Sequence, residues 1–136
     1  MGTVPLLGDE EASPEARAVL DDIRLKRGAE PNTFWRALAH DPAEMRELWE
    51  RAQAVMAPGA LDPLVKELIY VAVSAANGCA YCVHSHTAAA RAKGMTPAQH
   101  AELLRVIGLA ARTNMLAQAL GVEVDEAFLS ISILSR

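Results

Sequence analysis

Residues 62–89 read DPLVKELIYVAVSAANGCAYCVHSHTAA, and this stretch decides the fold. It opens on Asp62-Pro63, a helix cap followed by proline at the first helical position. It is interrupted at Gly78, a residue type that commonly ends helices in a left-handed conformation, and a second helical segment follows from Cys79. Because helices joined by so short a turn run antiparallel, the stretch predicts a helical hairpin.

The same punctuation recurs along the chain and predicts a bundle of six to eight helices. Cap-then-proline pairs open several segments, and Gly or Pro-Gly closes them. A short turn after Asn32 carries Phe34, Trp35 and Leu38, which we expect to fill the core. The expected helices cover residues 14–26, 42–56, 64–76, 79–93 and 97–120, the last with a bend at Gly108.

Composition favours an all-helical protein. Hydrophobic residues make up 51% of the 136-residue chain, whereas aromatic residues make up 4%. The apolar content is therefore mainly Ala, Leu and Val, which suits closely packed helices better than sheets. No linker or internal repeat divides the chain, so we expect a single helical domain over residues 1–136.

Charge and hydropathy exclude several classes of partner. The chain has 13 Lys and Arg against 17 Asp and Glu, a net charge of -4, with no basic cluster suited to nucleic acid. No apolar run approaches the roughly 20 residues that span a bilayer, and the N-terminus lacks the pattern of a secretory signal. We therefore expect a soluble, cytoplasmic protein with no nucleic-acid partner and no membrane association.

Two cysteines in such a compartment are not expected to form a structural disulfide. Cytosolic thiols are kept reduced, and a pair with two residues between them closes almost no loop. At helical spacing, Cys79, Cys82 and His86 share one stripe. Cys82 and His86 are four apart and can hydrogen-bond, while Cys79 and Cys82 can form a disulfide across one turn. His84 faces elsewhere, and we expect it and His100 at the surface or an interface.

Apolar residues surround segment 64–76, whose only charges are Lys66 and Glu67, so we expect this helix to be buried. Glu67 then needs a partner or a proton, although a solvated position at the helix start is an alternative. If Gly78 reverses the chain, Glu67 and His86 differ by only about 4 to 5 Å in level, at a rise of 1.5 Å per residue. The hairpin thus predicts a Glu, His, Cys proton path ending in a dithiol, with contact directly or through a water.

The spacing Glu67, eleven residues, Cys79, two residues, Cys82, three residues, His86 resembles the signature of the alkyl hydroperoxidase D-like proteins, within the carboxymuconolactone decarboxylase superfamily. The surrounding text NGCAYCVHSHTAAARAKGMTPAQ is similar to theirs as well. The resemblance covers about residues 61–121 and is weaker outside them. Four polar residues correctly spaced on a helical hairpin are a far more specific match than a CxxC motif by itself.

The resemblance implies a thiol-dependent peroxidase or disulfide reductase that uses no metal, haem or other cofactor. In such relatives the cysteine matching Cys82 attacks a hydroperoxide, and the cysteine matching Cys79 resolves the sulfenic acid to a disulfide. The residues matching Glu67 and His86 relay the proton. The implied assembly is a homotrimer or hexamer, and the implied redox partner is a lipoyl-bearing protein, a thioredoxin-like donor or a peroxiredoxin.

Two parts of the assignment have alternatives, namely the peroxiredoxin-reducing role and the identity of the attacking cysteine. Well-studied members carry a His immediately before the second cysteine where this chain has Tyr81, which bears on the peroxiredoxin-reducing role more than on the dithiol chemistry. The helix N-terminus favours Cys79 as the attacking thiol, whereas a base four residues on favours Cys82. We choose Cys82, because such a base can both remove and return the proton.

Three other functions compete with dithiol chemistry. A zinc site could use Cys79, Cys82, His86 and Glu67 or another His, but a second ligand pair of the usual kind is missing. A non-enzymatic oligomeric scaffold would leave the thiols unused. The superfamily also includes lactone decarboxylases that use no cysteine pair. The tail 122–136 is predicted as a short helix or strand whose apolar side chains lie on a partner or in the core, namely Phe128, Leu129, Ile131, Ile133 and Leu134.

Overall fold

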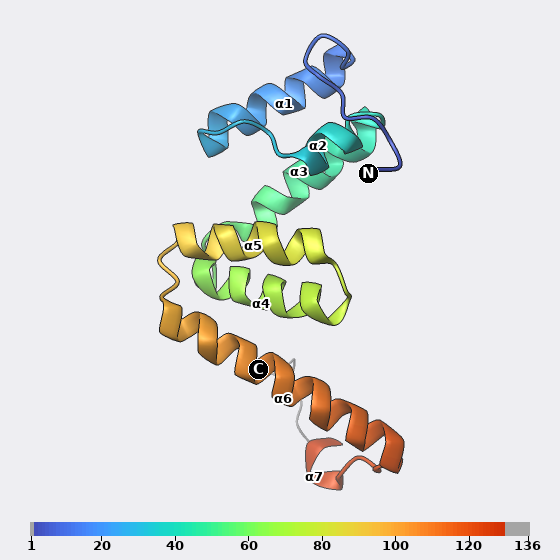
Figure 1. Cartoon of the computed structure of the whole chain (residues 1–136), viewed down its shortest axis with the longest axis vertical. Helices are drawn as coiled ribbons and strands as arrows, with labels where there is room; N and C mark the ends of the chain where they lie inside the picture. The colour runs from blue at the N-terminus through green and yellow to red at the C-terminus, as the bar shows by residue number, and fades with distance from the viewer. Residues whose placement is uncertain (1, 130–136) are drawn as a thin grey trace. The chain divides into compact units, whose positions relative to one another are not determined.

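The computed structural model describes residues 2–129, which form seven α-helices and no strand (Figure 1). The prediction of an all-α fold with six to eight helices is therefore confirmed over this range. Most helix ends fall within one or two residues of the expected positions, because the capping residues act locally. The helices are α1 (Pro14–Arg27), α2 (Thr33–Leu38), α3 (Pro42–Met56), α4 (Pro63–Ala76), α5 (Ala80–Ala92), α6 (Pro97–Leu120) and α7 (Glu126–Leu129).

The chain divides into two compact units, Met1–Pro58 and Gly59–Arg136. The first unit contains α1, α2 and α3, and the second contains the four remaining helices. The boundary falls at Pro58-Gly59, the pair that ends the α3 segment in the sequence. The expectation of one domain over residues 1–136 stays a prediction.

The first unit has a small core built on one face of α1. Val19, Leu20 and Ile23 are fully or almost fully buried at the spacing of a single helix face. They belong to one cluster with Trp35 and Trp49, whose rings meet edge to face at 5.4 Å between centroids. The expectation that Phe34 also fills the core is wrong, because it is 42% exposed on a helix of six residues that buries only Trp35.

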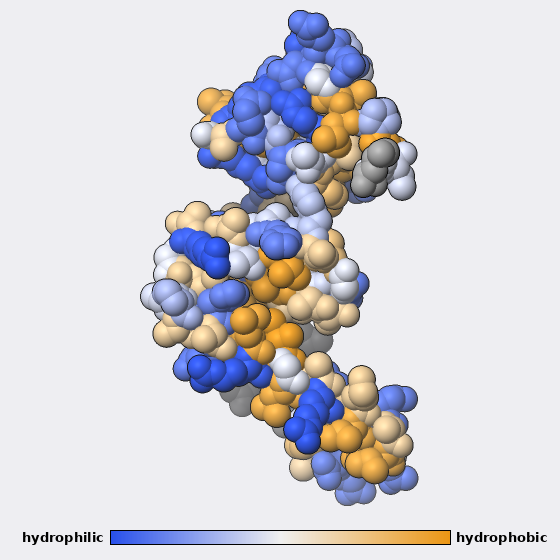
Figure 2. Space-filling model, in the orientation of Figure 1, coloured by the Kyte–Doolittle hydropathy of each residue, from blue (hydrophilic) through white to orange (hydrophobic). Residues whose placement is uncertain are grey.

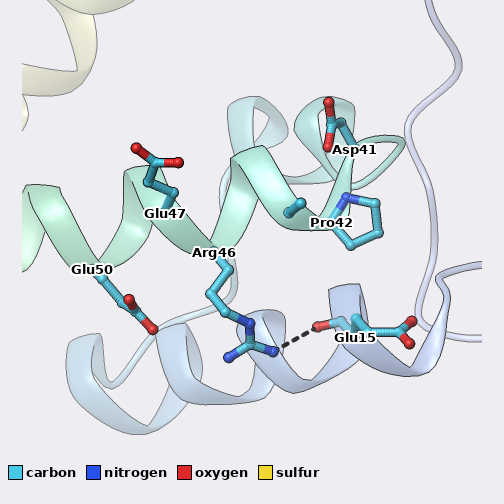
Figure 3. A pocket seen from close by; sticks show the side chains of 7 residues that line it. Glu15, Asp41, Pro42, Arg46, Glu47 and Glu50 are labelled. Carbon is cyan, nitrogen blue, oxygen red and sulfur yellow. Dashed lines mark hydrogen bonds between the residues drawn. The ribbon is translucent and has the colours of Figure 1, made fainter.

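An open depression in the first unit lies between α1 and α3 (Figure 3). Arg46 spans it and donates from Nη2 to the main-chain oxygen of Glu15 at 3.5 Å. The other side chains around it are mostly acidic, so its electrostatic character is negative. The lining consists of Glu15, Asp41, Pro42, Ala43, Arg46, Glu47 and Glu50.

The second unit is organised around the predicted hairpin of α4 and α5, which pack along each other (Figure 1). Asp62 caps α4 by accepting from the amide of Leu64 at 2.9 Å. At the turn, Gly78 has φ +70°, a left-handed conformation that L side chains rarely adopt. The amide of Cys79 then donates to the Ser74 carbonyl at 2.9 Å. Cys79 is the N-cap of α5 rather than its first residue, so the helix begins one position later than expected.

The prediction that α4 is buried on all sides is wrong for the single chain. Within its unit α4 packs against α5 and α6, and its buried residues are Glu67, Val71 and Ser74. Ile69 and Val73 on other faces are 47% and 52% exposed. The all-round apolar pattern of α4 therefore leaves hydrophobic surface that the described chain does not cover.

Helix α6 begins with a capping box, in which the Thr96 and Gln99 side chains each bond the main-chain amide of the other residue. It continues without interruption through Gly108, where a bend was expected. Of the predicted tail, the structure gives α7, which carries Phe128 and Leu129. Ile131, Ile133 and Leu134 lie outside the described residues. None of the described helices combines the length and apolar content that crossing a bilayer requires.

Candidate active site

The hairpin brings Glu67 of α4 against His86 of α5. Nδ1 of His86 lies 2.7 Å from Oε2 of Glu67, across 19 residues of sequence. The predicted contact is therefore confirmed in its direct form, with no bridging water needed. The register follows from the tight turn at Gly78, which lets the two helices run back along each other.

Glu67 is a buried carboxylate with two partners. Its side chain is 5% exposed, and its second oxygen, Oε1, accepts from Nζ of Lys93 at 3.0 Å. Burial by itself would raise the pKa of Glu67, but the hydrogen bonds and charges of His86 and Lys93 outweigh it and hold that pKa below its ordinary value of 4.5. Glu67 is therefore an anion at neutral pH, and the alternative of a solvated Glu67 is wrong.

The charge state of Glu67 fixes the proton on His86. An ionised carboxylate has only acceptor atoms, so Nδ1 of His86 must carry the hydrogen and donate it to Oε2. In the neutral ring, Nε2 then holds the lone pair and can accept a proton. The pair has the arrangement of an oriented base, in which the carboxylate orients the imidazole and the imidazole can exchange a proton on its other nitrogen.

Tyr70 packs flat on the same imidazole. The centroids of the Tyr70 and His86 rings are 3.5 Å apart and their planes are inclined by 16°. Tyr70 follows Glu67 by three residues on α4, so both side chains lie toward α5. His86 is thus held at its edge by one α4 residue and on its face by another.

The two cysteines form a disulfide at the start of α5. Cys79 and Cys82 are bonded, with their Cα atoms 5.3 Å apart, as expected for a pair across one turn. The main-chain amide of Cys82 also donates to Sγ of Cys79 at 3.2 Å. A sulfur at an N-cap that accepts such a bond is placed where a negative charge would be stabilised after reduction.

The hairpin brings together all four residues singled out from the sequence. Cys82 and His86 lie one turn apart on α5, Cys79 caps that helix, and Glu67 reaches it from α4. His84 is exposed, in agreement with its expected position away from the site. A group of three or more His, Cys, Asp or Glu side chains arranged to hold a metal ion does not occur within residues 2–129.

Sequence reasoning missed Lys93 and Tyr70. Both had a usable signal: Tyr70 stands three residues after Glu67, and Lys93 stands seven after His86, so each shares a helix face with a predicted residue. Neither type is diagnostic at such a spacing, because exposed helix positions commonly carry Lys, and Tyr is common in partly buried ones. Only the packing of α4 on α5 identifies them.

Solved structures support the same fold. The chain is 60% identical to the alkylhydroperoxidase AhpD core from Rhodospirillum rubrum ATCC 11170, with a TM-score of 0.92 over 96% of this chain and 99% of that one. It matches an uncharacterized peroxidase-related protein from Ralstonia eutropha JMP134, also an alkylhydroperoxidase AhpD core, with a TM-score of 0.53 at 21% identity, covering 92% of this chain and 93% of that one. At 21% identity, the match to the Ralstonia protein supports the fold alone.

Curated relatives include two proteins named alkyl hydroperoxide reductase AhpD. One, from Azorhizobium caulinodans, is 33% identical over 93% of this chain and 72% of its own length. The other, from Solibacter usitatus, is 41% identical over 71 residues, which is 52% of this chain and 38% of that protein. The match therefore spans well under half of the Solibacter relative.

The model of the carboxymuconolactone decarboxylase family matches residues 42–123. This range contains α4, α5 and α6 entire, and with them the disulfide and the Glu67–His86 pair. Together with the Azorhizobium relative, this match decides membership. The chain belongs to the carboxymuconolactone decarboxylase family.

Proposed function

We propose that this protein is a thiol-dependent peroxidase or disulfide reductase of the alkyl hydroperoxidase D type. One observation carries the proposal: a disulfide capping α5 stands one turn from an imidazole that a buried carboxylate orients. The names of the Rhodospirillum and Azorhizobium relatives support the same reaction class. Hydroperoxides are the proposed oxidants.

The proposed reaction uses the pair in its reduced form. The Cys82 thiolate attacks the terminal oxygen of a hydroperoxide, the O–O bond breaks, and the alkoxide leaves as an alcohol after taking up a proton. Cys82 becomes a sulfenic acid. The Cys79 thiol then attacks the Cys82 sulfur, the S–O bond breaks, and water leaves as the disulfide forms. The peroxide gains two electrons and the two thiols lose them.

The roles of the remaining residues follow from their positions. His86 is one turn after Cys82, and helical side chains lean toward the preceding turn, so we expect the ring to reach the Cys82 sulfur. We assign Nε2 the removal of the thiol proton and its return to the leaving oxygen. Glu67 keeps Nδ1 protonated and stabilises the imidazolium that forms in between.

Turnover needs a donor of two electrons that converts the disulfide back to the dithiol. A lipoyl-bearing protein or a thioredoxin-like protein supplies them by thiol–disulfide exchange, in which a donor thiolate attacks one sulfur and a mixed disulfide is then resolved. Passing electrons onward to a peroxiredoxin is the alternative direction. Tyr81, which is 42% exposed beside Cys82, would lie in such a contact.

Oligomerisation is also part of the proposal, as a homotrimer or hexamer. Residues 111–120, the last ten residues of α6, are all exposed, and several of them are apolar. Figure 2 shows apolar surface on the visible face of this helix. Met115 and Leu120 are 73% and 75% exposed. A long helix of this kind is stable when another surface covers it. Light scattering on the wild type and on Met115→Glu, which should dissociate, tests the assembly.

Thiol counting tests the proposed chemistry. Reduced protein, freed of reductant, is mixed with a small excess of an alkyl hydroperoxide, and free thiols and intact mass are measured. We expect both thiols of each chain to disappear. The mass of the chain should fall by two hydrogen atoms, one from each thiol. Thiols that persist at a concentration of peroxide that oxidises free cysteine would contradict the proposal and favour a scaffold.

A further inference from the structure

We propose that Tyr70 is a positioning residue that fixes the plane of the His86 ring and so keeps Nε2 directed for proton transfer. The inference deepens the proposed function, on which its kinetic part rests. It starts from the stacked geometry of the two rings, 3.5 Å between centroids at 16°. The residues belong to different helices, so the stack also depends on the hairpin register.

The hydrogen bond to Glu67 does not by itself fix the imidazole. It holds Nδ1 against Oε2 at 2.7 Å, which prevents a flip of the ring that would put a carbon there. It leaves the ring free to tilt about the line that joins these two atoms, since hydrogen bonds at carboxylate oxygens tolerate a broad range of directions. Tilting would move Nε2, which is the atom that must meet the thiol.

The stack removes that remaining motion. A tilt of the imidazole would separate its face from the phenol ring and lose the contact between two flat surfaces. The two constraints are perpendicular, one at the edge of the ring and one on its face. Both come from the same face of α4, because Glu67 and Tyr70 are three residues apart.

The position of Tyr70 argues against a role in core packing alone. Tyr70 is 45% exposed, while the buried residues of α4 are Glu67, Val71 and Ser74. His86 keeps 24% of its side-chain surface exposed, so without Tyr70 one ring face would open to water. A flat aromatic ring at this half-exposed position covers one face of the imidazole, and its replacement leaves no core cavity.

Two substitutions at Tyr70 separate the effect of the aromatic ring from the effect of the hydroxyl. Tyr70→Phe keeps the stack and removes the hydroxyl, whereas Tyr70→Leu keeps an apolar side chain and removes the aromatic face. We expect Tyr70→Phe to resemble the wild type. We expect Tyr70→Leu to lower kcat for peroxide reduction by about 10-fold to 100-fold, as small misplacements of a reacting group do, with little change in KM. Val73→Ala, at another exposed α4 position, is the matched control.

The second readout is the NMR signal of the His86 ring protons, which needs no turnover. A stacked phenol ring shifts these signals upfield, and His86→Ala identifies them by their loss. We expect the shift in the wild type and in Tyr70→Phe, and its loss in Tyr70→Leu, while the circular dichroism of all three stays the same. A shift unchanged in Tyr70→Leu would overturn the inference.

The two readouts keep the inference distinct from the proposed function. A wild-type protein that does not react with hydroperoxide refutes the proposed function, and the ring-proton shifts still decide whether Tyr70 orients His86. A reactive wild type with equal kcat in Tyr70→Leu overturns the positioning role even where the stack is lost. Loss of activity in Tyr70→Phe would also overturn it, because the hydroxyl would then be the active feature.

Discussion

Nδ1 of His86 donates to Oε2 of Glu67 at 2.7 Å, from one arm of a helical hairpin to the other. The same carboxylate accepts from Lys93 through its second oxygen, so both of its oxygens have a partner. The disulfide caps the helix that carries His86.

Replacing His86 by Ala should slow peroxide reaction by about 10²-fold or more, the usual effect of losing a general base, and leave the helical content unchanged. Stopped-flow measurement of thiol loss gives the rate. The matched control is His84→Ala, since His84 is exposed on the same helix two residues away. Equal rates in wild type and His86→Ala would remove His86 from the mechanism.

Single cysteine variants should separate the attacking sulfur from the resolving one. Cys79→Ser leaves Cys82 without its resolving partner, so a sulfenic acid should accumulate there and be trapped by a dimedone-type reagent. Cys82→Ser should show no such adduct. Because the Cys79 sulfur accepts an amide hydrogen bond at the N-cap, the opposite labelling pattern would assign the attack to Cys79.

Glu67 should make folding stability depend on pH in the acid range. Its folded-state pKa lies below the ordinary 4.5, so its contribution is complete above that value and is lost as pH falls through the folded-state pKa. Glu67→Gln should cost about 1–3 kcal/mol at neutral pH, because charge-assisted hydrogen bonds to a buried group are lost.

Urea unfolding of wild type and Glu67→Gln at one protein concentration measures this contribution. The difference between the two should be constant above pH 4.5 and shrink on acidification. Glu102→Gln, at an exposed position on α6, should show no comparable pH-dependent difference. A difference that grows as pH falls would contradict an ionised Glu67.

Lys93 should keep Glu67 ionised. Burial raises the pKa of Glu67, and His86 and Lys93 lower it. In Lys93→Met only His86 remains to lower it, so the pKa of Glu67 should rise. Carbon-13 NMR of the carboxyl group measures this directly, and the acid limb of the peroxide rate should move to higher pH with it. Arg91→Met removes an exposed cation from the same helix and should leave both unchanged. Lys93→Arg should restore most of the wild-type behaviour.

The turn at Gly78 should be sensitive to a single methyl group. Ala at φ +70° costs roughly 1–2 kcal/mol, because Cβ approaches the neighbouring carbonyl in the left-handed region. At Gly108, inside α6, nothing lies within 4 Å of an added Cβ, so Gly108→Ala should stabilise by about 0.5–1 kcal/mol. Thermal unfolding should give changes of opposite sign for the two variants.

The sequence by itself determined most of the helices and the four residues of the candidate site. Caps such as Asp62 and stops such as Gly78 act through bonds within one or two turns, so the local sequence suffices to place helix ends. Spacing on one helix placed Cys82 and His86 a turn apart, and counting residues from the turn placed Glu67 at the level of His86.

Only the tertiary structure decided which faces of α4 are covered and what surrounds the imidazole. The apolar pattern of α4 indicated burial all round, yet Ile69 and Val73 are exposed, because burial depends on which helices pack against it. Lys93 and Tyr70 could be placed beside Glu67 and His86 only from the structure, because their contacts depend on how α4 packs on α5. A helix fixes which residues share a face, but the partner of that face is set by the packing of distant segments.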